Sequence, residues 1–337
     1  MTDRWLSDDG TVGWERNSVR NSLDRWENRT HQRIAIMGSS TSKDWLPGRL
    51  LERVLGAKRG SVVDAHINGC HQGCTWASVR RMRQRHDMKR CRWRGEKRCE
   101  PSEKKRFDAV FFGTNLFQMC EHSHSKRILQ HRMLLPTEDI PLLIAMYRHG
   151  QNGLRDAGRF LGMQLSEAYG DVRALRDYWG RKFIGNGRRG QEHRWYRKTA
   201  KNNPKEVLSC AYEPADVALK LRFTEALLDD LQYLSQKTYL MLLPDRSLAL
   251  SDPIHKARWQ RHRLAHQALV ASRPWVSLID LSTGGVAHTA QFRDGFHLKK
   301  KSYGIQQALL KRRLKALGVG PKQRKKSEPA GKKVLKK

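Results

Sequence analysis

The chain has 337 residues, of which 38% are hydrophobic and ten are tryptophan, and its formal net charge is +33. This composition argues against a wholly disordered chain, because disordered sequences are poor in aromatic residues. No stretch approaches the roughly 18 apolar residues that a membrane-spanning helix needs. The amino terminus has no apolar signal core behind a basic start. We therefore expect a folded domain that is cytoplasmic if Met1 is the native start.

The first third of the chain alternates apolar runs with helical patterns. The sequence predicts short buried strands at 33–37, 61–67 and 107–112, each followed by turn residues. A helix is predicted at 45–55, where apolar residues recur at helical spacing on one face. A second helix is predicted after Gly73. Strands that alternate with helices predict a mostly parallel sheet with helices on both faces.

The remainder continues this pattern after a long, basic and mainly helical stretch that ends in an amphipathic helix. The predicted elements are helix 217–235, strand 238–243, helix 254–272, strand 275–281 and helix 303–317. For the whole chain we predict a polar arm at 1–31, one domain at 32–320 with a helical insertion at about 136–235, and a disordered basic tail at 321–337.

The residues that follow the predicted strands are the candidates for chemistry, because ligands of an open α/β sheet lie beyond the carboxyl ends of its strands. A serine nucleophile needs a base, a group that orients the base, and donors for the oxyanion. Ser40 lies in a tight turn after the first strand. Asp294 and His297 are close enough in sequence for the carboxylate to hold the imidazole. Asn115 offers a side-chain amide, and Gly73 offers a backbone N–H.

These blocks resemble those of the SGNH/GDSL hydrolase superfamily. The matching segments are Gly38-Ser39-Ser40 for the family's Gly-Asp-Ser, Gly73 for the second-block glycine, Gly113-Thr114-Asn115 for Gly-x-Asn, and Asp294-x-x-His297 for the final block. The resemblance implies a flavodoxin-like three-layer α/β/α sandwich with a parallel sheet. It implies a catalytic triad of Ser40, Asp294 and His297, and an oxyanion hole formed by Ser40, Gly73 and Asn115. The implied activity is a serine hydrolase or acyltransferase that acts on an ester-linked acyl group without a cofactor.

Two departures from the family pattern narrow the resemblance to one branch. Ser39 replaces the usual Asp, and a long helical insertion separates the third block from the final block. Both features are similar to the branch of polysaccharide O-acetylation and teichoic-acid D-alanylation proteins. This branch implies acyl transfer to polymers, although its members are membrane-anchored or exported and this chain shows no such segment.

The same residues also have plain structural interpretations. Ser40 belongs to a residue type that often caps helices, and Asn115 to one that often closes turns. Gly69 competes with Gly73 for the oxyanion position, since a glycine after a strand often marks only a turn. The presence of an Asp-x-x-His block favours Ser40 as a nucleophile over Ser40 as a cap.

Nine Cys and His residues fall between Cys70 and His124, but their spacing is irregular. Structural zinc sites have paired ligands at short, regular spacing, so we expect no bound metal. The six cysteines of the chain do not form the pattern of a small secreted disulfide scaffold, and we expect them to be reduced thiols.

Positive charge is concentrated between Arg80 and Arg106, with thirteen Lys or Arg against four acidic residues, and in the tail. Such a field attracts polyanions, including nucleic acid, acidic polysaccharide and an anionic lipid surface. We therefore expect an anionic or polymeric substrate. The alternative is a catalytically inactive protein of the same fold that binds a polyanion, although no nucleic-acid-binding motif accompanies the basic segment.

Overall fold

The computed structural model describes residues 31–66, 72–94, 105–119, 140–147, 158, 214–249, 253–284, 291–292 and 297–319. The predicted tail, nearly all of the predicted arm and most of the range 136–235 lie outside these residues. Within the described ranges, no helix is both long enough and apolar enough to cross a bilayer.

Five parallel strands form one sheet in the order β2-β1-β3-β4-β5. The strands are β1 (Ile34–Met37), β2 (Val62–Asp64), β3 (Phe107–Thr114), β4 (Ser235–Leu242) and β5 (Val276–Asp280). This strand order is the flavodoxin-like order of doubly wound folds. All five predicted strands are confirmed, with small differences at their ends.

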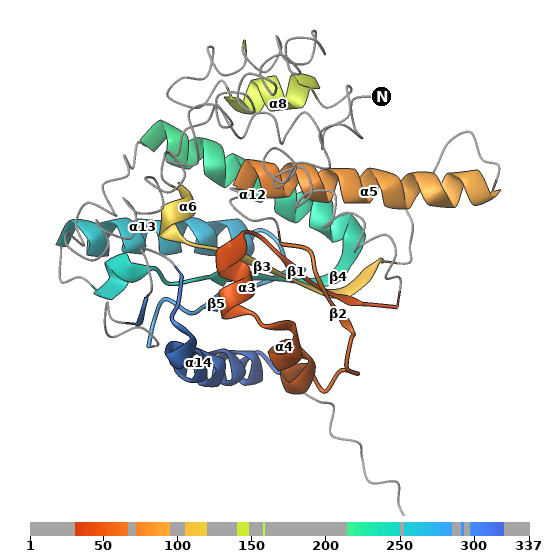
Figure 1. Ribbon diagram of the computed structural model, residues 1–337. Coiled ribbons are helices and arrows are strands. Elements are labelled where there is room, and N and C mark those ends of the chain that lie inside the picture. The colour runs from red at the N-terminus through yellow and green to blue at the C-terminus, as the bar shows by residue number, and fades with distance from the viewer. Residues whose placement is uncertain are drawn as a thin grey trace, which may run out of the picture.

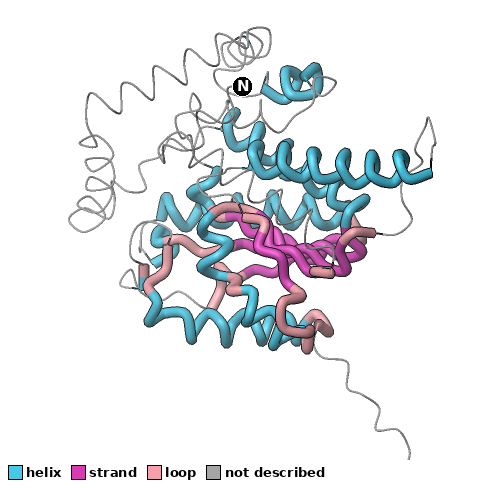
Figure 2. Tube along the Cα trace, turned by 45° about the vertical axis from the view of Figure 1, so that its right-hand side comes forward, coloured by secondary structure: helices cyan, strands magenta, loops and turns pink. Residues whose placement is uncertain are grey.

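Helices cover both faces of the sheet (Figures 1 and 2). One face carries α3 (Ser40–Trp45), α4 (Gly48–Leu55) and α14 (Tyr303–Ala316), whose apolar side chains share one core with alternate strand residues. The other face carries α5 (Gln72–Arg94), α12 (Pro214–Leu234) and α13 (Pro253–Ala271). The predicted three-layer α/β/α sandwich is therefore confirmed.

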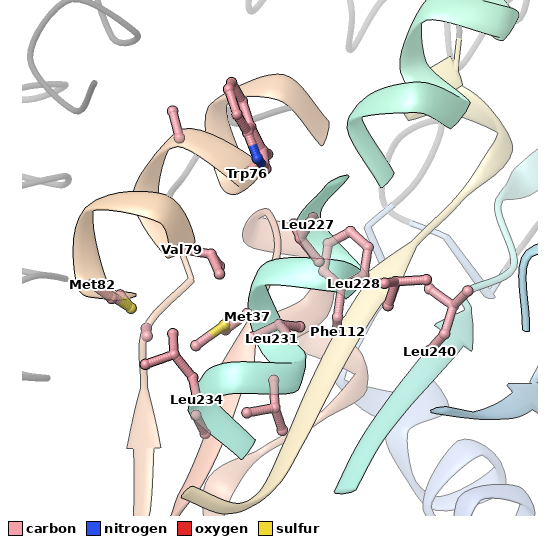
Figure 3. Close-up of a cluster of buried hydrophobic side chains, with 14 of the residues drawn as sticks. Met37, Trp76, Val79, Met82, Phe112, Leu227, Leu228, Leu231, Leu234 and Leu240 are labelled. Carbon is pink, nitrogen blue, oxygen red and sulfur yellow. The ribbon is translucent and has the colours of Figure 1, made fainter. Parts of the chain in front are cut away.

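Helix α12 lies inside the range 136–235, yet it packs directly on the sheet as the crossover between β3 and β4. Figure 3 shows Leu227, Leu228 and Leu231 of this helix against Phe112 and Leu240 of the sheet. These side chains are at most 1% exposed. Leucines at helical spacing thus place one face of α12 in the core, as the amphipathic pattern at 217–235 predicts.

Helices α5 and α12 are also joined by a buried carboxylate. Asp230 of α12, 3% exposed, accepts hydrogen bonds from Trp76 Nε1 at 3.1 Å, Arg80 Nη1 at 2.8 Å and Arg83 Nη1 at 2.7 Å. A buried charge persists only where opposite charges and donors surround it. Two arginines of the basic segment therefore pair with a core carboxylate.

The predicted helix at 45–55 is wrong in its bounds, because the structure has two helices here. Helix α3 ends at Trp45, and α4 begins at Gly48 after Pro47. Proline has no N–H for the helical ladder and disfavours a helical conformation in the preceding residue. The first helix begins at Ser40, and its N-cap is Ser39, whose hydroxyl accepts the Thr41 N–H. The interpretation of Ser40 as the N-cap is therefore also wrong.

Cys74, in the first turn of α5, is fully buried and disulfide-bonded. The expectation of reduced thiols is therefore wrong at this position. Sequence spacing does not show which cysteines the fold brings within bonding distance. Disulfides are typical of oxidising compartments, so this bond gives no support to a cytoplasmic location.

Two glycines let the first turn of α3 lie against the end of the sheet. Gly38 follows β1 with φ at +118°, and a Cβ there would lie 2.8 Å from Gly113 O and still closer to Ser42 Oγ. A Cβ at Gly113 would lie 2.6 Å from Leu243 Cδ1. Ser42 Oγ, which is fully buried, donates a hydrogen bond to Gly113 O at 3.3 Å. The two glycines thereby allow the first turn of α3 to approach the ends of β1 and β3 closely.

Helix α13 carries a buried histidine pair. His262 and His266 are at most 1% exposed, and their ring centroids are 4.3 Å apart. His266 Nδ1 is paired with the His262 carbonyl, whereas the other three ring nitrogens have no hydrogen-bond partner in the described structure. Burial lowers the pKa of His266 to about 4. Burial, with the charges of His266 and Arg263, lowers the pKa of His262 well below its usual value.

We predict that Gly38→Ala lowers the free energy of unfolding by about 2–5 kcal/mol, because it adds a clash to a strained backbone conformation. Urea unfolding of the purified protein measures this loss. Gly60→Ala is the matched control, since Gly60 has φ at +82° with open space around its Cβ position. The control should cost only about 1–2 kcal/mol of left-handed strain. Equal losses in the two variants would contradict the close approach of α3 to the sheet.

We also predict that stability falls as the pH decreases from about 6.5 to about 4. The pKa values of His262 and His266 are lowered in the folded protein, so the unfolded chain binds more protons in this window. The loss from His266 alone is on the order of 3 kcal/mol. Urea midpoints measured across this window should change less in His266→Leu than in the wild type. Identical slopes in His266→Leu and the wild type would contradict the prediction.

Candidate active site

The carboxyl ends of β1, β2 and β3 lie side by side at one edge of the sheet. Met37 is paired with Phe112 and Ile36 with Asp64, so the residues that follow these strands are neighbours. The turn at Gly38 thus lies beside Gly113, where the third block begins. The parallel register brings together the first and third blocks.

Ser40 is the first residue of α3, and its side chain lies outside the described atoms. The hydroxyl of the preceding residue, Ser39, is hydrogen-bonded to side chains of the fold. Ser39 Oγ is buried, accepts Gln118 Nε2–H at 2.7 Å and lies 2.8 Å from Thr41 Oγ1. The Ser39 hydroxyl therefore has a structural role in the N-cap of α3. Ser40 is the next residue, at the first position of the helix.

Asn115 follows β3 and is 0% exposed. Its side-chain Oδ1 accepts the Gln118 N–H at 2.9 Å, and its own N–H donates to Gln118 Oε1 at 3.0 Å. This reciprocal pair is a capping box at the start of α6 (Leu116–Met119). Asn115 thus has the structural role of a turn residue.

The other end of the Asn115 amide has no partner. Nδ2 makes no hydrogen bond in the described structure, although a buried unsatisfied donor costs about 1–3 kcal/mol. Because a backbone N–H occupies Oδ1, the amide cannot turn over to satisfy the donor. The fold therefore holds a fully buried N–H donor, without a partner among the described residues, at the strand edge that carries Ser40.

Gly73 lies in the first turn of α5 and is buried. Gln72, beside it, donates from Nε2 to Thr114 Oγ1 at 2.8 Å, and Thr114 precedes Asn115. The start of α5 is thus tied to the end of β3, which places Gly73 near the third block. Gly69, the competing glycine, lies outside the described residues.

His297 is half-buried, whereas Asp294 lies outside the described residues. An antiparallel bridge between Phe292 and Leu298 holds the segment that precedes α14. Tyr303, the first residue of α14, donates from its hydroxyl to Asp44 Oδ1 of α3 at 3.4 Å. The carboxyl-terminal end of α3 therefore contacts the first residue of α14, which follows the segment that carries His297. The triad of Ser40, Asp294 and His297 is a prediction that the described residues do not test.

A carboxylate–imidazole pair that the sequence did not predict lies at the end of β2. His66 Nδ1 and Asp64 Oδ1 are hydrogen-bonded at the end of β2, and His66 is 7% exposed. Burial works to raise the pKa of Asp64, but the hydrogen bonds and charge of His66, with the charge of Lys43, lower this pKa overall. Asp64 and His66 both lie inside the predicted strand 61–67, whereas β2 ends at Asp64, so the prediction did not mark them as strand-end residues.

Three consecutive lysines follow the final block. Lys300 and Lys301 are exposed and Lys299 is half-buried. None of these three ammonium groups forms an ion pair in the part of the chain that the structure describes. These three lysines therefore contribute positive charge beside His297 that no described carboxylate neutralises.

No protein-family model matches the chain, and no curated protein matches it significantly. Among solved structures, the chain is similar to one described as "a putative platelet activating factor from Streptococcus pneumonia". The TM-score is 0.39 and the identity 14%, and the match covers 93% of this chain and 98% of that chain. A likeness of this degree says nothing about activity, so the site rests on its own geometry.

Proposed function

We propose that the protein is a serine hydrolase or acyltransferase of the SGNH/GDSL type, with Ser40 as nucleophile. The observation that carries the proposal is the buried Asn115 Nδ2, an amide donor with no partner in the described structure. An oxyanion hole needs such a donor, already oriented and shielded from water, before substrate arrives.

In this proposal, His297 accepts the proton of Ser40 while Ser40 Oγ attacks the acyl carbonyl, and Asp294 holds the imidazole tautomer. The Asn115 amide and the backbone N–H groups of Ser40 and Gly73 stabilise the oxyanion. Collapse of the tetrahedral intermediate breaks the ester bond, and His297 returns its proton to the leaving alcohol. Water or an acceptor hydroxyl then takes the acyl group from Ser40 in the reverse sequence.

The charge near the site supports an anionic or polymer-linked substrate. Lys299, Lys300 and Lys301 follow His297 after one residue, Leu298, and ion pairs with described residues do not neutralise them. An ester carried on an acidic polysaccharide or another polyanion would be attracted to this edge. In this proposal the lysines contact the anionic polymer and not the reacting carbonyl, so they do not select the acyl group.

We predict that a fluorophosphonate probe labels the folded protein at Ser40. Ser40→Ala should abolish labelling, because the probe reacts only with an activated serine hydroxyl. Ser272→Ala is the matched control, since Ser272 is an exposed serine at the end of α13, and this variant should label like the wild type. Absence of labelling in a folded sample, together with tight and salt-sensitive binding to nucleic acid, would favour the non-catalytic alternative instead.

The base can be identified by comparing the two histidines at the site. With p-nitrophenyl acetate as substrate, His297→Ala should lower kcat at least about 10³-fold, because the serine loses its general base. His66→Gln should retain activity within several-fold, since His66 is paired with Asp64 at the end of β2. Circular dichroism at the assay temperature controls for folding of both variants. A large loss in His66→Gln with an active His297→Ala would reverse the assignment and make Asp64–His66 the catalytic pair.

A further inference from the structure

Gln118 connects the two halves of the proposed site. Its backbone N–H and side-chain Oε1 both bond to Asn115, at 2.9 and 3.0 Å, while its Nε2 donates to Ser39 Oγ at 2.7 Å. Ser39 is the residue directly before the proposed nucleophile. Gln118 and Asn115 are 7% and 0% exposed, so these bonds form away from bulk water.

The orientations of both amides follow from backbone donors. Gln118 Oε1 faces the Asn115 N–H, which has only a proton to offer, so Nε2 must face Ser39. In the same way, Asn115 Oδ1 faces the Gln118 N–H, so Nδ2 must be the unsatisfied end. The direction of the Asn115 donor is therefore set by the backbone N–H of Gln118, while the Gln118 side chain ties the Asn115 backbone to Ser39.

Ser39 stands where the resembling family has Asp, and Gln118 is its partner in this chain. A buried hydroxyl needs a donor or acceptor to be satisfied. Ser39 Oγ receives the Gln118 amide in addition to the weaker Thr41 N–H at 3.4 Å. The turn that presents Ser40 is thereby attached to the residue that orients Asn115.

We infer that Gln118 is a positioning residue that sets the Asn115 donor and the Ser40 turn in register for catalysis. The inference rests on the proposed function, since it assigns Gln118 a role in the same site. Gln118 does not touch the substrate, and it acts through Asn115 and Ser39. A misplaced oxyanion donor loses stabilisation of the transition state more than binding of the ground state.

The test is a double-mutant cycle in esterase kinetics with p-nitrophenyl acetate. Gln118→Met keeps the length of the side chain but removes its two hydrogen bonds, and it should lower kcat about 10–100-fold with KM within about twofold. Gln118→Met in an Asn115→Ala background should lower kcat much less, because the donor that it positions is already absent. Gln260→Met, on the exposed face of α13, is the control and should behave like the wild type.

The pH dependence of the Gln118→Glu variant distinguishes a positioning role of Gln118 from a role in packing alone. Gln118→Glu can donate to Ser39 only when the carboxyl group is protonated. Its activity, expressed relative to the wild type at each pH, should therefore rise as the pH falls through the raised pKa of a buried carboxyl group. A purely structural role would give a ratio that does not change with pH while the variant stays folded.

The outcomes distinguish this inference from the proposed function. If the wild type hydrolyses the ester and Gln118→Met matches it, or if the two substitutions act additively, Gln118 has no positioning role and the proposed function stands. If the wild type neither hydrolyses the ester nor reacts with the fluorophosphonate, the proposed function fails and the inference fails with it. Non-additive kcat effects together with the pH-dependent ratio are the result expected.

Discussion

The contact between the first turn of α3 and the end of the sheet is the constraint on which the site depends. Gly38 and Gly113 leave no side chain between this turn and the neighbouring strand, so Ser42 packs against the Gly113 carbonyl. This close approach brings Ser39 within reach of Gln118 of α6. A larger residue at either glycine would separate the turn at Ser39 and Ser40 from Gly113-Thr114-Asn115.

Ser39, Asn115 and Gln118 form a small polar network beside this contact, and most of its donors and acceptors are hydrogen-bonded. Gln118 uses its N–H, Oε1 and Nε2, and Asn115 uses its N–H and Oδ1. Asn115 Nδ2 is the donor of this network that has no partner among the described residues. In the proposed oxyanion hole, a substrate oxygen would satisfy this donor.

The cationic residues of the described structure fall into two groups. Arg80 and Arg83, which belong to the basic segment, bind the buried Asp230 and join α5 to α12. The lysines from Lys299 to Lys301 have no such partner in the described residues and lie beside His297. The formal charge of +33 is thus partly structural, and only its uncompensated part can attract an anionic ligand.

The sequence by itself determined the fold class, because buried parallel strands and amphipathic helices leave local periodic patterns, as at β3 and α12. It also located the strand-end blocks that contain Ser40 and Asn115. Tertiary structure alone decided which serine caps α3, that Cys74 is disulfide-bonded, and that His66 pairs at the same edge. The bond from Gln118 to Ser39 spans 79 residues, and no local pattern encodes a partner at that distance, since only the packing of the strands brings the two side chains together.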